Sequence, residues 1–172
     1  SSPSGTGKTT LCKMLIERDK RVSLSVSVTT RSKRANEVNG KDYFFVDKLE
    51  YDKMIKKDEF LEHAEVFENY YGTPKKNVEE KLSEEYDMLF DIDWNGALQV
   101  YSKLNKDDVL SIFILPPSVE ELENRLRTRA QDSEEVVKSR MKKAKDEISH
   151  YKEYEYVIIN EDLEKTYSEI EA

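Results

Sequence analysis

The chain has 172 residues, and 28 Lys and Arg against 36 Asp and Glu give it a formal charge of −8 at neutral pH. This length fits about one domain with a sizeable core. The acidity argues against a protein that coats nucleic acid, because phosphate backbones need a basic face. The single cysteine cannot form an internal disulfide, and no apolar run is long enough to span a bilayer. We therefore expect no nucleic-acid partner and no membrane partner.

Apolar periodicity and turn residues predict helices and strands in alternation along the chain. Three N-cap patterns begin helices, at Asp47 with Glu50, at Ser118 with Glu121, and at Asp132 with Glu135. The predicted helices are 8–18, a helix from 47, about 75–84, 94–104, 118 to about 129, 132 to about 150, and 163–170. The predicted strands are 22–28, 42–46, strands joined by a turn within 60–71, then 87–93, 109–115 and 156–159. Alternation at both ends of the chain favours an α/β protein with a parallel sheet.

The segment SGTGKT at residues 4–9 matches the second half of the phosphate-binding pattern G-x-x-x-x-G-K-[ST]. The first glycine of that pattern is Ser2 here, a small residue that suits the position unless it requires a positive φ. Because the sequence opens directly on this loop, we expect a strand to precede it. A glycine-rich turn before a helix is the alternative interpretation of the same residues.

The chemistry of such a loop explains its residue types. Gly5 and Gly7 permit backbone conformations that a Cβ would obstruct, and the loop amides and the start of the next helix attract phosphate oxygens. Lys8 would neutralise the β- and γ-phosphates of a nucleotide, and the hydroxyl of Thr9 would bind Mg²⁺. The predicted ATP-phosphate residues are Ser4, Gly5, Thr6, Gly7, Lys8, Thr9 and Thr10.

Three further groups of residues admit two interpretations each. Arg31 and Arg34, with Tyr43 nearby, could form a second anion site or a solvated basic loop. Arg125 and Arg129 share a helix face, and Arg140 lies on the next helix; they could close over phosphates or form an ordinary charged surface. Asp91 and Asp93, two residues apart at a strand end, could both face a ligand crevice.

The chain resembles the guanylate kinases over nearly its whole length. The similarity lies in the phosphate loop and in six further segments that occur in the family's order. These are TTRSKRANEVNGKDYFFV (29–46), FLEHAEV (60–66), YYGTPK (70–75), DIDWNG (91–96), RLRTRAQDSEE (125–135) and VIIN (157–160). The resemblance implies transfer of the γ-phosphoryl group of MgATP to GMP, and to dGMP, giving ADP and the nucleoside diphosphate.

The resemblance also implies a division of the chain. It predicts a three-layer P-loop core with a parallel sheet at residues 1–31 and 85–172, including a helical lid at about 118–150. A mixed-sheet lobe that binds GMP would be inserted at residues 32–84. This lobe and the lid are expected to close when both nucleotides are bound.

Residue roles follow from the same resemblance. The GMP phosphate would be held by Arg31, Arg34, Tyr43 and Tyr71, and the base would be approached by Ser27, Glu62 and Thr73. Asp91 would serve the water shell of Mg²⁺ and Asp93 the GMP site. Lys8, Arg125, Arg129 and Arg140 would be the catalytic cations, and Asn160 would lie near the adenine.

The chemistry of Glu62 fits its implied role independently. Guanine presents two adjacent donors, N1–H and the 2-amino group, and one carboxylate can accept from both. Adenine has an acceptor at N1 and would leave the carboxylate unpaired, so such a site rejects it. A solvated acid on a strand is the alternative for this residue.

Two rival functions remain open. A guanylate-kinase-like scaffold that binds protein ligands without catalysis could dispense with Lys8 and the lid arginines, which this chain keeps. A related P-loop kinase could act on another phosphorylated small molecule. Dependence on ATP and the lack of a recognisable targeting signal lead us to expect a cytoplasmic location.

Overall fold

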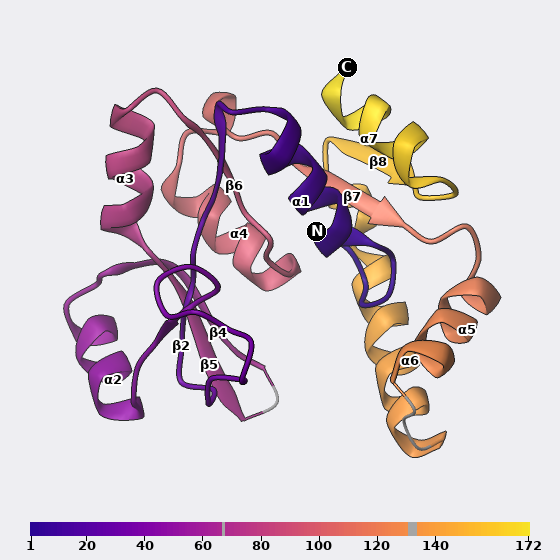
Figure 1. Cartoon of the computed structure of the whole chain (residues 1–172), viewed down its shortest axis with the longest axis horizontal. Coiled ribbons are helices and arrows are strands. Elements are labelled where there is room, and N and C mark those ends of the chain that lie inside the picture. Colours follow the sequence, from indigo (N-terminus) through magenta and orange to yellow (C-terminus); the bar gives the residue numbers. More distant parts are fainter. Residues whose placement is uncertain (67, 131–133) are drawn as a thin grey trace. The chain divides into compact units, whose positions relative to one another are not determined.

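The computed structural model describes residues 1–66, 68–130 and 134–172; of residues 129 and 130 it describes the backbone alone. The chain forms two units, one made of Ser1–Arg18 and Lys106–Ala172 and the other of Asp19–Asn105. Both contain helices and strands (Figure 1), which confirms the predicted α/β class. None of the helices in the described ranges combines the length and apolar character needed to cross a bilayer.

The first unit is organised around a parallel pair of strands, β7 (Ile112–Leu115) and β8 (Tyr156–Ile159). Ser1 runs along the other edge of β7, because its amino group donates to the Ile112 carbonyl and its carbonyl accepts from the Ile114 amide, both at 2.8 Å. Helices α1 (Lys8–Arg18) and α7 (Leu163–Glu171) contact each other and complete this core. The buried residues of the core are Leu11, Ile114, Ile158 and Tyr167.

Two long helices of the first unit, α5 (Val119–Ala130) and α6 (Glu134–Ser149), pack on each other through a separate apolar cluster. Its buried members are Leu122, Leu126, Val137, Met141 and Ala144. The Ser118 hydroxyl accepts from the Glu121 amide at 3.0 Å, as the N-cap pattern predicts. The predicted cap at Asp132 lies outside the described residues. Short 3₁₀ turns occur at Lys106–Asp108 (η1) and Tyr151–Glu153 (η2).

The second unit contains a mixed four-stranded sheet and a separate parallel strand pair. In the four-stranded sheet the order is β3-β2-β5-β4, and β4 pairs with β5 as an antiparallel hairpin. The strands are β1 (Val22–Leu24) paired with β6 (Asp87–Leu89), and β2 (Val28–Thr29), β3 (Phe44–Phe45), β4 (Phe60–Val66) and β5 (Asn69–Pro74) in the larger sheet. The helices are α2 (Lys48–Lys56), α3 (Lys75–Ser83) and α4 (Trp94–Lys103).

Four predicted strands are longer than the observed ones. The strand predicted at 42–46 is reduced to β3 (Phe44–Phe45). The strand predicted at 22–28 is divided between β1 and β2, which belong to different sheets. The strand predicted at 87–93 ends at Leu89, so Asp91 and Asp93 follow the strand rather than belonging to it. The strand predicted at 109–115 begins at Ile112. In each case apolar periodicity continues past the point where the backbone stops pairing with a neighbour.

Candidate functional site

The phosphate loop of the first unit has the backbone conformation that its glycines predict. Gly5 and Gly7 have φ values of 92° and 93°, a region that residues with a Cβ rarely adopt. A Cβ on Gly7 would also come within 2.6 Å of Nδ2 of Asn160. Helix α1 begins at Lys8, and its first bond runs from the Leu11 amide to the Gly7 carbonyl at 3.1 Å. The loop thus leads directly into a helix N-terminus, the arrangement that binds phosphate.

Buried hydrogen bonds fix the shape of this loop. The Thr6 hydroxyl donates to the Pro3 carbonyl at 2.9 Å, and Nδ2 of Asn160 donates to the Thr6 carbonyl at 2.6 Å. Oδ1 of Asn160 accepts from the Thr166 hydroxyl at 3.0 Å. Both ends of the Asn160 amide are therefore bonded inside the protein, and this side chain, 3% exposed, connects the loop to α7.

The remaining loop residues are compatible with a phosphate site. Ser2 is buried, its hydroxyl donates to the Pro3 carbonyl at 3.0 Å, and its φ is not positive, so serine fits where the pattern has glycine. Ser4, Thr9 and Thr10 are exposed and Lys8 is half-buried. Polar groups that could meet a ligand are therefore on the surface, while those that maintain the loop are inside.

A cavity of about 260 Å³ adjoins the loop within the first unit. The residues that line it are Gly5, Gly7, Thr10, Arg125, Asn160, Glu161 and Leu163. Arg125 is half-buried, and its Nε donates to Oε1 of Glu121 at 2.8 Å on the preceding turn of α5. The structure thus brings the predicted cation Arg125 and the predicted adenine neighbour Asn160 to the same cavity as the phosphate loop.

The other predicted lid arginines have different surroundings. Arg140 is half-buried on α6, and the side chain of Arg129 lies outside the described part of the structure. Arg127, which has no predicted role, is paired with Glu123 at 2.7 Å and with Glu134. These hydrogen bonds raise the pKa of Arg127 above its usual value.

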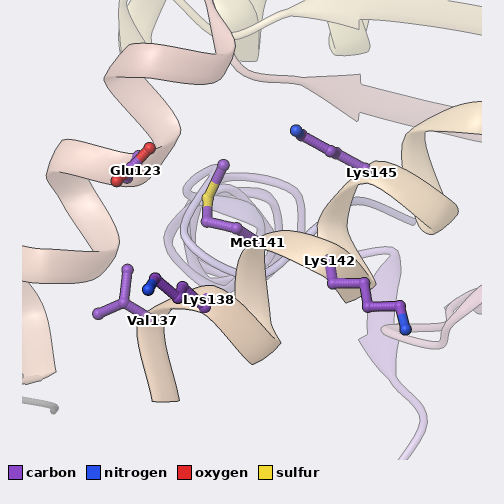
Figure 2. A pocket seen from close by; sticks show the side chains of 6 residues that line it. All are labelled: Glu123, Val137, Lys138, Met141, Lys142 and Lys145. Atoms are coloured by element: carbon purple, nitrogen blue, oxygen red, sulfur yellow. The ribbon is translucent and has the colours of Figure 1, made fainter. Parts of the chain in front are cut away.

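A second cavity of the first unit, of about 310 Å³, lies between α5 and α6 (Figure 2). Three lysines from successive turns of α6 are among the residues that line it, and Glu123 comes from α5. The lining residues are Glu123, Val137, Lys138, Met141, Lys142 and Lys145. Among the predicted site residues whose side chains are described, none lines this cavity.

The second unit gathers three of the predicted GMP-phosphate residues. The guanidinium of Arg31 lies 5.4 Å from the centroid of the Tyr43 ring, and the Tyr43 and Tyr71 rings meet edge to face at 6.1 Å. Burial raises the pKa of the Tyr43 hydroxyl, and the negative charge of Asp91 acts in the same direction. Two phenol groups and a guanidinium therefore converge, and Asp91 is close enough for its charge to affect the Tyr43 hydroxyl.

The fourth predicted clamp residue, Arg34, contributes differently. Its side chain is exposed, and its backbone amide donates to Oε2 of Glu37 at 2.8 Å. The other oxygen of Glu37 accepts from Nη2 of Arg31 at 2.6 Å. This hydrogen bond is the main cause that raises the pKa of Arg31 and lowers that of Glu37.

The predicted base reader, Glu62, is a buried carboxylate on β4. It is 5% exposed, and its Oε1 accepts from the hydroxyl of Thr73 on β5 at 2.6 Å. Burial raises the pKa of Glu62, and the charge of Asp93 raises it further while the Thr73 bond opposes the shift. Thr73, which is expected to approach the base, thus donates its hydroxyl proton to Glu62. Ser27 is half-buried next to β2, and its carbonyl accepts from the Phe44 amide at 2.9 Å.

Asp93 and Gly96, at the start of α4, lie beside Glu62. Asp93 is the N-cap of α4, since its Oδ1 accepts from the Gly96 amide at 2.9 Å. A Cβ on Gly96 would come within 2.9 Å of Oε2 of Glu62 and 3.2 Å of the Ile92 side chain. Only a residue without a side chain leaves the carboxylate of Glu62 in its present position.

Four residues near the sites were not identified from the sequence as functional: Glu37, Gly96, Glu121 and Thr166. The i, i+4 spacing of Glu121 and Arg125 is a signal that could have revealed their pairing. The contacts of Gly96 and Thr166 depend on tertiary packing and leave no local pattern.

Comparison with known proteins finds relatives over the whole length of the chain. The guanylate kinase family model matches residues 1–172. The chain belongs to the guanylate kinase family. It is 55% identical to a guanylate kinase of Paramagnetospirillum magneticum over 172 residues, which cover 100% of this chain and 80% of that protein. It is 52% identical to a guanylate kinase of Rhodopseudomonas palustris, covering 100% and 78% of the two chains.

A solved structure agrees with the sequence comparison. The crystal structure of guanylate kinase from Anaplasma phagocytophilum matches with a TM-score of 0.76 and 43% sequence identity, covering 94% of this chain and 76% of that one. Guanylate kinases are phosphotransferases that use ATP and GMP.

Proposed function

We propose that this member of the guanylate kinase family transfers the γ-phosphoryl group of MgATP to GMP or dGMP. A phosphate oxygen of the acceptor forms a bond to the γ-phosphorus as the bond to the β,γ-bridging oxygen breaks, and ADP leaves. The first unit would bind the donor through the loop amides of residues 4–10, with Lys8 on the β- and γ-phosphates. The cavity lined by Thr10, Arg125 and Asn160 supports a place for the rest of the donor nucleotide.

The second unit would bind the acceptor, and residues 32–84 would be its main part. Arg31, Arg34, Tyr43 and Tyr71 would hold the GMP phosphate through charge-assisted and hydroxyl hydrogen bonds. The convergence of the Arg31, Tyr43 and Tyr71 side chains supports this role.

The buried carboxylate of Glu62 would select guanine over adenine. An acid with 5% exposure and one oxygen held by Thr73 has its second oxygen fixed in direction. A fixed carboxylate pairs with the N1–H and the 2-amino group of guanine, and adenine would leave it unpaired in a buried place. Ser27 and Asp93 would line the same acceptor site, and Thr73 would act by positioning Glu62.

The lid arginines would supply charge when the transferred group is between the two nucleotides. In that state negative charge spreads over three equatorial oxygens, and guanidinium groups stabilise it more than they stabilise the ground state. Arg125, Arg129 and Arg140 are assigned this role, on a lid at about residues 118–150. Closure would also exclude water, which would otherwise accept the phosphoryl group.

The oxygen donors of the chain suit a Mg²⁺ ion that keeps most of its water. Within the described ranges, no cluster of three or more His, Cys, Asp or Glu could hold a metal ion. Magnesium in kinases is commonly bound by substrate phosphates, waters and one or two protein oxygens. The exposed hydroxyl of Thr9 and, through water, the carboxylate of Asp91 are donors of that kind. When bound, the ion would neutralise charge on the β- and γ-phosphates.

No general base is required for this reaction. The attacking group is a phosphate oxygen that is already ionised at neutral pH, so the protein acts mainly by positioning and by neutralising charge. Because the donor is ATP, we expect the protein to act in the cytoplasm.

A coupled assay of ADP release tests the proposed function. The acceptors are GMP, dGMP, AMP, UMP and ribose 5-phosphate, with a reaction lacking any acceptor as the blank. Turnover with GMP and dGMP alone supports the proposal. Turnover with a different acceptor would indicate a related P-loop kinase, and no turnover with any acceptor would indicate a binding scaffold.

A further inference from the structure

The loop between β2 and β3 is organised around one carboxylate, that of Glu37. Its Oε1 accepts from Nη2 of Arg31 at 2.6 Å, and its Oε2 accepts from the Arg34 backbone amide at 2.8 Å. The Glu37 amide in turn donates to the Arg34 carbonyl at 3.1 Å, which closes a tight turn. A single side chain thus connects to both arginines that are assigned to the GMP phosphate.

The pair formed by Glu37 and Arg31 differs from an ordinary surface ion pair. The two side chains are 17% and 16% exposed, so water screens their attraction less than it does on an open helix surface. The contact raises the pKa of Arg31 and lowers the pKa of Glu37, so it favours the ionised form of both groups. The pair therefore persists through the neutral pH range.

Other contacts of Arg31 leave its guanidinium little freedom. Its Nη1 donates to the Ser32 carbonyl at 2.8 Å, and its backbone amide donates to the Thr29 hydroxyl at 3.2 Å. The guanidinium also lies over the rings of Tyr43 and Phe45, at 5.4 and 5.8 Å from their centroids. Among these contacts, the one with Glu37 is an ion pair, and it occupies Nη2 of the guanidinium.

Two opposing effects decide what Glu37 does to an incoming phosphate. Its negative charge would repel the phosphate, but each of its oxygens already accepts a hydrogen bond. Against this, an arginine held in place loses less conformational entropy when a ligand binds than a mobile one does. The guanidinium has five N–H donors, and Glu37, Ser32 and Tyr71 do not use all of them, so donors remain for a ligand.

We propose that Glu37 is a positioning residue that holds Arg31 and the Arg34 turn ready for the GMP phosphate without contacting that phosphate itself. This inference rests on the proposed function, since it concerns the acceptor site of that reaction. Glu37 would influence the capture of GMP, and would leave the binding of ATP unaffected.

The test is Glu37→Gln, which keeps the size of the side chain and an acceptor for the Arg34 amide but removes the charge opposite Arg31. We expect the KM for GMP to rise roughly tenfold, as for a lost charge-assisted hydrogen bond. The kcat and the KM for ATP should stay within about twofold, since a general folding defect would alter them too. Glu79→Gln, an exposed acid on α3 of the same unit, is the matched control and should leave all three constants unchanged.

A second variant separates positioning from other effects. In an Arg31→Gln background, Glu37→Gln should change the KM for GMP by less than about twofold, because its partner is already lost. An unchanged or lower KM for GMP in Glu37→Gln alone would overturn the inference, and so would an equal rise in both backgrounds. If the unaltered protein neither binds nor phosphorylates GMP, the proposed function fails as well, so the two failures are distinguishable.

Discussion

The two units build their sites by different means. In the first unit the phosphate loop presents backbone amides, and its shape depends on two glycines with positive φ and on the buried Asn160. In the second unit the proposed functional groups are side chains such as Arg31 and Glu62, each held by another side chain. A backbone site is encoded by consecutive residues, whereas a side-chain site depends on partners that are distant in the sequence.

Among the tests of this comparison, Lys8→Ala has the largest expected effect. We expect kcat to fall by about 10²–10³-fold, since a positioned charge on the transferring group is lost. GMP affinity, measured by calorimetry, should be nearly unchanged, because the proposed acceptor residues belong to the other unit. Normal turnover in this variant would show that Lys8 does not act in the donor site.

Glu62→Gln tests the side-chain site. One acceptor oxygen becomes a donor that faces the donors of guanine, so kcat/KM for GMP should fall by roughly 10²-fold. The KM for ATP should be retained. Glu65→Gln on the same strand is the control, since Glu65 is exposed. Equal GMP kinetics in the two variants would show that Glu62 does not read the base.

Asn160→Ala tests the support of the backbone site. The Thr6 carbonyl and the Thr166 hydroxyl would lose a buried partner, and we expect the KM for ATP to rise roughly tenfold as the loop loosens. Asn124→Ala on α5 is a matched exposed control. A wild-type KM for ATP in Asn160→Ala would mean that the loop keeps its shape without this bond.

The smallest expected effect concerns pH. Burial raises the pKa of Glu62. On acidification, Glu62 therefore becomes protonated at a higher pH than an ordinary glutamate does. The KM for GMP should therefore rise on acidification through that pKa. GMP phosphate also titrates near neutrality, but that contribution persists in Glu62→Gln and can be subtracted. Identical pH profiles in both proteins would contradict the prediction.

The same pKa shift makes a prediction about stability. A folded-state pKa above the unfolded one stabilises the fold at low pH, and this contribution is lost as pH rises through the folded value. Ionised Glu62 therefore destabilises the fold at neutral pH. Glu62→Gln should raise Tm at pH 8 relative to the unaltered protein, and the difference should vanish near pH 3. Equal Tm values at both pH values would contradict this.

Local signals predicted much of the fold. Helix 8–18, strand 156–159 and the Asp47 cap are observed as predicted, because each depends on neighbouring residues. The division of 22–28 between two sheets was missed, since periodicity does not record which strand is the neighbour.

The sites show the same limit. The glycine conformations of the phosphate loop follow from consecutive residues. The bond from Thr73 to Glu62 spans 11 residues and that from Asn160 to Thr6 spans 154, so neither could be read from spacing. Asp93 was assigned to the substrate, and its role as the cap of α4 became visible only with the helix itself.

The missing side chain at Gly96 sets a condition for redesign of acceptor preference. Even one methyl group there would press on Oε2 of Glu62, which lies 2.9 Å from the position of a Cβ. An engineer who enlarges this position must shorten its neighbour as well, for instance by combining Gly96→Ala with Glu62→Asp. A library for acceptor preference should therefore vary the two positions together, because the space at Gly96 depends on the side chain at residue 62.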